Sequence, residues 1–409
     1  MDKQRQYIEA FYKRMINNAG ILSEKDIDAI KTTEDATLAF VDNPCVEAAH
    51  RVYNAYFDAY KIFESESDNP FLQLVELMRY FEETISIMTS NQRDHFVHSV
   101  NVFVLGFCIY EKNEKFRKAF AEVNRELPDS SYGDWCAESS FFIRWGTASL
   151  IHDVGYPVQI ISNTLKAYLD LIAGGAETGK KVKVELAFED FESLNALDEI
   201  VPMPEFAKSF IEHYPNHVYI NITKPTDLMA HRIHETLGID IKAVAKDIPD
   251  YIKRGGKICM IDHGVYSSLV VLKWYAAAIQ KLGADGYSLF FPVLDSATAI
   301  LLHNYYSVYG LQGAPFNLGP MSAYQNPTAY LLILCDSLQE WNRASYGVSN
   351  QTKVYPSEAS LDLDDGLSII LKSETGKLSE EYLGDVEKDV RSKVDVDEIF
   401  DSFKLLAES

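Results

Sequence analysis

Apolar residues recur at three- and four-residue intervals along most of this chain. Such a repeat places the apolar side chains on one face of a helix, so it predicts amphipathic or buried helices. The segments that show it are 8–22, 48–63, 71–88, 95–120, 141–153, 267–282, 296–310 and 328–343. The helix that ends near Asp153 is followed by Gly155 and Pro157, and both residue types commonly terminate helices.

Two regions depart from this repeat. Residues from about 160 to 255 carry more charge and include a pair of glycines, so we expect an insertion or lid that is partly loop. Apolar and polar residues alternate over 360–373 around Asp364-Asp365-Gly366, which predicts a β-hairpin. The acidic stretch 378–409 is expected to form one or two amphipathic helices.

The expected fold is therefore mainly α. We expect a helical extension over 1–88, a central helical domain over 89–349 that contains the insertion, and a small α+β appendage over 350–409. Of the 409 residues, 47% are hydrophobic, which is enough to bury an extensive core.

The charge of the chain limits its partners. It carries 60 acidic and 38 basic residues, a formal charge of −22. A surface this negative repels nucleic-acid backbones and anionic membranes, so we expect neither a polynucleotide nor a membrane partner. A small anionic substrate is still compatible, because a bound metal ion can reverse the local field. The sequence leaves a homo-oligomer open.

Three features predict a cytoplasmic protein. No run of 18 apolar residues would span a membrane. The first twenty residues lack the apolar stretch and the cleavage site of a secretory signal. The five cysteines are scattered without a CxxC pair, so we interpret them as reduced and mostly buried.

Several of the ten histidines stand in apolar helical segments, where an ionisable side chain needs a partner. His152 and Asp153 are adjacent at the end of a buried helix, so they can offer a nitrogen and an oxygen ligand to a metal ion. Asp153 could also bridge to a second ion. His303 in AILLHNYY and Asp336 in LLILCDS have equally apolar settings. Asp262, before Gly264, is expected to cap a helix.

The segment SLIHDVGYP resembles the signature of the HD superfamily of metal-dependent phosphohydrolases. His98, in RDHFVHSVNVFVLG, resembles the family's first histidine, and Asp336 resembles its final aspartate. His263 and His303 match two further histidines of the binuclear subset, which includes HD-GYP and cyclic-nucleotide phosphodiesterase-like enzymes. The resemblance covers about 90–160 and 258–345 and implies an HD-type helical bundle. The metal ligands it implies are His98, His152, Asp153, His263, His303 and Asp336.

The chain departs from HD-GYP proteins in three respects. Tyr156 replaces the lysine that often follows their glycine, and their downstream GYP motif is absent. His263 follows His152 by 111 residues, a longer gap than in those proteins. His213 or His217 is therefore the alternative third histidine ligand.

The resemblance implies hydrolysis of a phosphomonoester or phosphodiester, with a nucleotide or cyclic nucleotide as the substrate class. Four imidazoles and two carboxylates suit two divalent transition-metal ions (Mn, Fe, Ni, Co or Zn, with Mg as an alternative at one site). The expected nucleophile is a hydroxide that bridges the ions, with Asp153 as a catalytic residue as well as a ligand, so no protein nucleophile is required.

Three further residues are candidates for catalysis or substrate binding. His95 lies one helical turn before His98, and a histidine at nearly this position protonates the leaving group in phosphodiesterase-like members. A supporting or surface role for His95 is the alternative. Arg93 could contact substrate phosphate. Arg144 could either contact substrate or pair with a carboxylate in the interior.

Two other functions are compatible with the same residues. A di-iron oxygenase resembling myo-inositol oxygenase uses a similar ligand set, and metal analysis with oxygen consumption would distinguish it. A catalytically idle HD module would sense a ligand without turnover. Such a module has no need of six intact ligands, which favours an enzyme.

Overall fold

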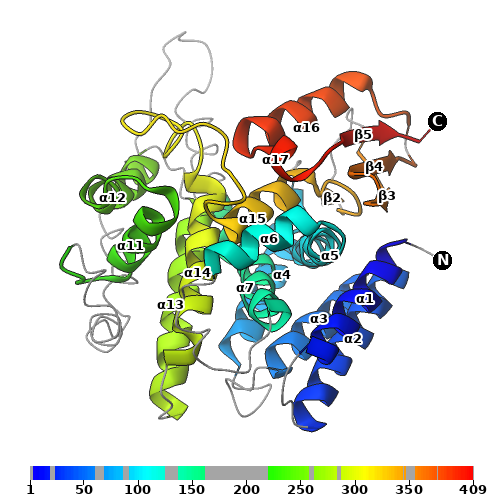
Figure 1. Cartoon of the computed structure of the whole chain (residues 1–409), viewed down its shortest axis with the longest axis horizontal. Helices are drawn as coiled ribbons and strands as arrows, with labels where there is room; N and C mark the ends of the chain where they lie inside the picture. Colours follow the sequence, from blue (N-terminus) through cyan, green and yellow to red (C-terminus); the bar gives the residue numbers. More distant parts are fainter. Residues whose placement is uncertain are drawn as a thin grey trace.

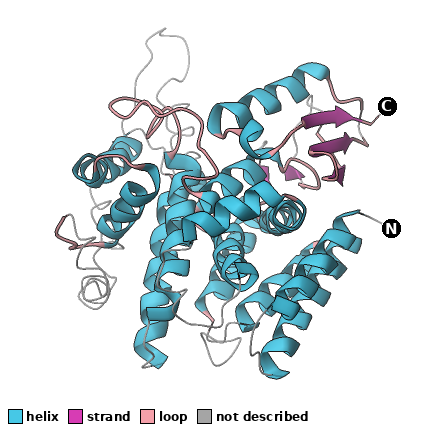
Figure 2. Cartoon of the chain, viewed as in Figure 1, coloured by secondary structure: helices cyan, strands magenta, loops and turns pink. Residues whose placement is uncertain are grey.

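Helices make up most of this protein, as the hydrophobic repeat predicts (Figure 1, Figure 2). The computed structural model describes residues 3–18, 24–59, 69–85, 92–124, 137–161, 220–257, 262–282, 287–343, 345–346, 355–374 and 376–408. Its first seven helices are α1 (Lys3–Asn18), α2 (Glu24–Asp42), α3 (Val46–Ala59), α4 (Pro70–Ile85), α5 (Phe96–Lys112), α6 (Glu114–Asn124) and α7 (Ala137–Ile151). The later ones are α11 (Pro225–Leu237), α12 (Ile241–Lys257), α13 (His263–Leu282), α14 (Tyr287–Tyr305), α15 (Pro327–Leu338), α16 (Glu380–Lys393) and α17 (Val396–Ile399).

Helix α5 is the central element of the fold. Every residue from Phe96 to Glu111 is buried, and a helix that is apolar on all sides must be surrounded by other elements. Helices α1, α3, α6, α7 and α15 pack around it. The indole of Trp145 on α7 donates a hydrogen bond to the carbonyl of Phe103, 2.9 Å away. This packing holds α5 and α7 in a fixed relation.

The N-terminal helices share their core with the central helices. The phenol of Tyr53 on α3 donates to the carbonyl of Phe96 at 3.1 Å, and that of Tyr56 donates to Ile143 at 3.0 Å. Buried residues of α1 and α3 belong to the same hydrophobic cluster as those of α5 and α7. The N-terminal extension therefore packs directly on α5 and α7.

Beyond residue 161 the expected insertion is described only from residue 220 onward, and that part is largely helical. Helix α11 packs against α13 and α14, and α12 packs against α11. Arg232 on α11 and Arg144 on α7 both pair with the buried carboxylate of Asp295 on α14, with N–O distances of 2.5 and 2.7 Å. The remainder of the insertion, 162–219, lies outside the described residues.

The C-terminal appendage combines strands and helices, as predicted. Strands β3 (Glu358–Asp362) and β4 (Leu367–Lys372) pair antiparallel and form the expected hairpin. The prediction that 378–409 is entirely helical was wrong at its end. Strand β5 (Phe403–Ala407) follows α17 and pairs parallel to β4, because its alternating buried and exposed residues match the free edge of that strand. A separate antiparallel pair joins β1 (Gln92–Arg93), which comes just before α5, to β2 (Ser345–Tyr346), which follows α15.

Among the described residues, no helix combines the length and the hydropathy needed to cross a membrane. Cys108 and Cys335 are buried free thiols and Cys45 is a partly buried one, while Cys136 and Cys259 lie outside the described residues.

Candidate metal centre

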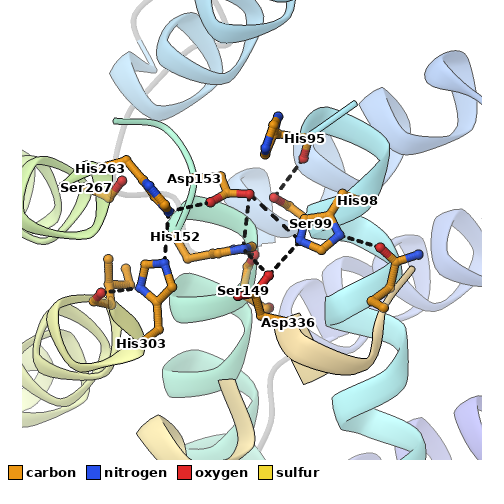
Figure 3. Close-up of polar contacts among 12 residues, drawn as sticks. His95, His98, Ser99, Ser149, His152, Asp153, His263, Ser267, His303 and Asp336 are labelled. Carbon is orange, nitrogen blue, oxygen red and sulfur yellow. Dashed lines mark hydrogen bonds and ion pairs between the residues drawn. The ribbon is translucent and has the colours of Figure 1, made fainter. Parts of the chain in front are cut away.

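The six ligands implied by the sequence meet in one place (Figure 3). Their ligand atoms form two groups, and within each group all atoms lie within 4.8 Å of one another. The first group is His98, His152 and Asp336, and the second is Asp153, His263 and His303. They come from α5, the turn after α7, the first residue of α13, the end of α14, and α15. Two imidazoles and one carboxylate suit a divalent transition metal, so each group could hold an ion.

Asp153 connects the two groups. Its Oδ1 lies 3.1 Å from Nε2 of His263, and its Oδ2 lies 3.2 Å from Nε2 of His152. The Oδ2 atom is also 3.8 Å from Nε2 of His98, which is itself 3.0 Å from Oδ1 of Asp336. One carboxylate oxygen therefore faces each group, as a bridging carboxylate requires.

Outer hydrogen bonds orient the histidines of the first group. The Nδ1 atom of His98 faces the side-chain oxygen of Gln339, whose amide nitrogen donates to the carbonyl of Trp341. The Nδ1–H of His152 donates to the carbonyl of Ser149 at 2.8 Å. A carbonyl can only accept, so each ring carries a proton on Nδ1, and Nε2 is the atom that faces the centre.

The second group is arranged in the same way. The Nδ1–H of His303 donates to the carbonyl of Ile300. The Nδ1–H of His263 donates to Oε1 of Gln159 at 2.8 Å, and the same oxygen accepts the backbone N–H of His263 at 3.3 Å. All four imidazoles thus direct Nε2 toward the centre, which is the usual arrangement of metal-binding histidines.

This arrangement fits cations. The Nε2 atoms of His263 and His303 are 3.0 Å apart, so close that a shared proton or a metal ion has to offset the repulsion between their lone pairs. The Nε2 atom of His152 is buried and makes no well-oriented hydrogen bond within the described part of the chain, although Oδ2 of Asp153 lies 3.2 Å away. Buried polar atoms seldom lack a partner, and a metal ion would supply one.

The electrostatics of the centre also favour cations. Burial alone would raise the pKa of Asp153 and Asp336, but neighbouring histidines keep both pKa values well below the usual range. Burial lowers the pKa of His98, and it lowers that of His303 to about 4. At His152 the two carboxylates outweigh burial and raise the pKa to about 10. Within the described residues no lysine or arginine forms an ion pair with either carboxylate, so bound cations would neutralise this charge.

The turn that carries the His–Asp pair packs tightly on α13. The backbone N–H of Gly155 donates to Oγ of Ser267 at 2.9 Å. A Cβ atom at position 155 would lie 2.4 Å from the carbonyl oxygen of His263. Only glycine allows this approach, which brings His263 next to Asp153.

His95 lies beside the centre and is held by two partners. Its Nδ1 is 2.5 Å from Oε1 of the buried Glu82, and its ring centroid is 3.6 Å from that of Tyr156. Its ring is 6.2 Å from that of His98. Burial lowers the pKa of His95 to about 3 and raises the pKa of Glu82 to about 8. The pair therefore carries no net charge at neutral pH, and one proton lies between Nδ1 and Oε1.

Glu82 was not among the residues identified from the sequence, although the sequence contains a signal for it. Phe71, Val75 and Met78 form a buried stripe on α4, and Glu82 is the next position on that stripe. A carboxylate in an apolar stripe needs a buried partner. Gln159 and Gln339 carried no comparable signal, because neither interrupts an apolar pattern.

The two arginines and the two alternative histidine ligands proposed from the sequence are not among the described residues of the centre. Arg144 is fully buried and pairs with Asp295, which corresponds to the interior role that the sequence left open. Arg93 lies in β1, and its side chain is outside the described residues, as are the alternative ligands His213 and His217.

Comparisons with protein-family models, with curated proteins and with solved structures found no match to this chain.

Proposed function

We propose that this protein is a metal-dependent phosphohydrolase of the HD type that hydrolyses a phosphate ester with two divalent transition-metal ions. One observation carries this proposal: six ligands from five separate elements converge, and Asp153 directs one oxygen to each group. His98, His152 and Asp336 would hold one ion, and His263 and His303 the other. The resemblance of SLIHDVGYP to the HD signature supplies the reaction class.

When bound, such a pair of ions supplies Lewis acidity toward a phosphoryl oxygen and toward the attacking water. The protein orients the ligands and balances the charge of the ions. The outer bonds to the four Nδ1 atoms fix the rings, and Asp153 and Asp336 compensate the positive charge. Water is the nucleophile in this proposal, so no serine or cysteine has to act.

His95 would deliver a proton to the leaving oxygen from its Nε2. Glu82 holds Nδ1 and shares its proton, and stacking on Tyr156 restricts rotation of the ring. General acids of this kind accelerate hydrolysis by about 100- to 10,000-fold. A nucleotide or cyclic nucleotide is the proposed substrate class, on the strength of the resemblance, and Mn, Fe, Co, Ni or Zn are the proposed metals.

The test is elemental analysis of anaerobically purified protein beside a phosphate-release screen. The screen covers phosphomonoesters, phosphodiesters, nucleotides and cyclic nucleotides with Mn²⁺ or Fe²⁺ present. We expect two ions per chain and turnover of at least one ester class. Asp153→Ala should abolish both, whereas Asp365→Ala, in the exposed hairpin loop, should retain both.

Wild-type protein that holds no metal and releases no phosphate would refute the proposal. Iron-loaded protein that consumes oxygen and releases no phosphate would assign oxygenase chemistry instead. Tight nucleotide binding without any turnover would assign a sensing module.

A further inference from the structure

The start of α13 is fixed by a carboxylate next to a proposed ligand. Oδ1 of Asp262, the residue before His263, accepts the backbone N–H of Gly264 at 2.7 Å and the side-chain amide of Asn304 at 3.0 Å. Its other oxygen accepts the phenol hydrogen of Tyr251, which belongs to α12. Asp262 thus caps α13, as expected, and also joins α12 and α14 to that cap.

The positions of both histidines of the second group depend on the contacts that Asp262 makes. Asn304 directly follows His303, and its amide nitrogen lies 3.2 Å from Nε2 of His263. The first turn of α13 also packs closely on His303, because a Cβ atom at Gly264 would lie 2.8 Å from Cε1 of that ring. A shift of Asp262 would therefore move both imidazoles.

Helix α12 has a second anchor near the same ligands. The phenol of Tyr305 donates to Oδ2 of Asp247 on α12 at 2.7 Å. The rings of Tyr251 and Tyr305 lie 4.9 Å apart at 60°. By contrast, Ser149 and Gln339, which orient the first group, lie on α7 and just after α15.

We propose that Tyr251 is a positioning residue for the second metal group, so that the docking of α12 controls the second ion and leaves the first one unaffected. This inference builds on the metal centre proposed above. The phenol holds Asp262, Asp262 holds the cap of α13 and Asn304, and these hold His263 and His303 at the distance an ion requires. The described part of the insertion is thus a support for half of the centre.

The test compares Tyr251→Phe with Tyr306→Phe in the full chain. Tyr306 directly follows α14 and donates its phenol hydrogen to the carbonyl of Gly319, which is not part of α12. Both variants lose one phenol hydroxyl, so they are matched chemically. Mn²⁺ binding is measured by titration calorimetry, and the metal retained after dialysis against graded chelator is measured by elemental analysis.

We expect Tyr251→Phe to bind one Mn²⁺ as wild type does and the other about 10- to 100-fold more weakly, the range found when outer partners of ligands are lost. Tyr306→Phe should match wild type. Adding His303→Ala to Tyr251→Phe should leave one ion per chain, and adding His98→Ala should leave almost none. The double variant Tyr251→Phe/Asp262→Asn should bind the second Mn²⁺ as tightly as Asp262→Asn alone does, because both changes act through the same carboxylate.

Equal weakening of both ions in Tyr251→Phe, or no weakening of either, would overturn the inference, as would an equal loss in Tyr306→Phe. These outcomes are separate from the fate of the proposed function. Protein that binds two ions with the expected dependence on Tyr251 but releases no phosphate would sustain this inference and refute the hydrolase. Wild type without metal would refute both.

Discussion

Metal binding should stabilise the folded protein in two separate and roughly equal steps. An ion present at about 100 times its Kd stabilises the native state by about 2.7 kcal/mol if it does not bind the unfolded chain. An unfolding entropy of about 2.1 cal/mol/K per residue amounts to about 0.9 kcal/mol/K over 409 residues. One ion should therefore raise the Tm by about 3 °C, and two ions should raise it by about 6 °C.

The two groups can be tested separately, because each has ligands that the other lacks. His98→Ala removes one imidazole from the first group, and His303→Ala removes one from the second. Each variant should retain about half of the wild-type shift. The shift is measured within each variant, with and without Mn²⁺, so any loss of packing caused by the substitution cancels.

Scanning fluorimetry or calorimetry with a Mn²⁺ series provides the measurement, and chelator provides the baseline. The buried core includes residues from the N-terminal helices, the central helices and the C-terminal appendage, so one cooperative transition is expected. A full wild-type shift in both single variants would show that the ions bind elsewhere. The absence of any shift in wild type would remove the metal centre altogether.

Three further substitutions test other parts of the structure. Glu82→Gln should lower turnover by about 10- to 100-fold, because His95 loses its proton partner, and elemental analysis should show unchanged metal content; a loss of metal would contradict the assigned role. Asp295→Ala should lower the free energy of unfolding, measured by urea denaturation, by about 3–5 kcal/mol, because two buried arginines lose their shared carboxylate. A change below about 1 kcal/mol would mean that solvent reaches these ion pairs. Gly155→Ala should destabilise the fold by about 1–3 kcal/mol, because the added methyl group would overlap the carbonyl of His263, and it should reduce metal retention by the second group. A variant with wild-type stability and metal content would rule out that close approach.

The ligand set followed from the resemblance of SLIHDVGYP to the HD signature, and the apolar settings of some of its members supported it. His303 and Asp336 stand within or directly after strongly apolar runs, and the structure places both beside His152. His263 lies 111 residues after His152, and this gap is why the sequence also offers His213 and His217 as the third histidine. Folding removes that distance, since Gly155 brings the His–Asp turn directly against the first residue of α13.

The outer partners could not be predicted, because they depend on contacts between distant segments. Gln159 and Gln339 are polar residues in ordinary positions, and only the packed structure shows that each accepts a hydrogen bond from a proposed ligand. The same holds for Arg144, whose partner Asp295 lies 151 residues away. Strand β5 was missed for a related reason, since its pairing partner β4 belongs to an earlier hairpin.

Because His152 and Asp153 are adjacent in the chain, a single turn links the two ligand groups. Consecutive residues at the end of a helix point in different directions, so one turn of backbone can serve both groups. His152 contributes to the first group, while Asp153 reaches the second with Oδ1 and the first with Oδ2. The separation of the two groups is therefore set by a single rigid turn, which α7 holds from one side and α13 from the other. A dipeptide held in this way would fix the spacing of the two proposed ions, and that spacing is what a two-metal reaction depends on.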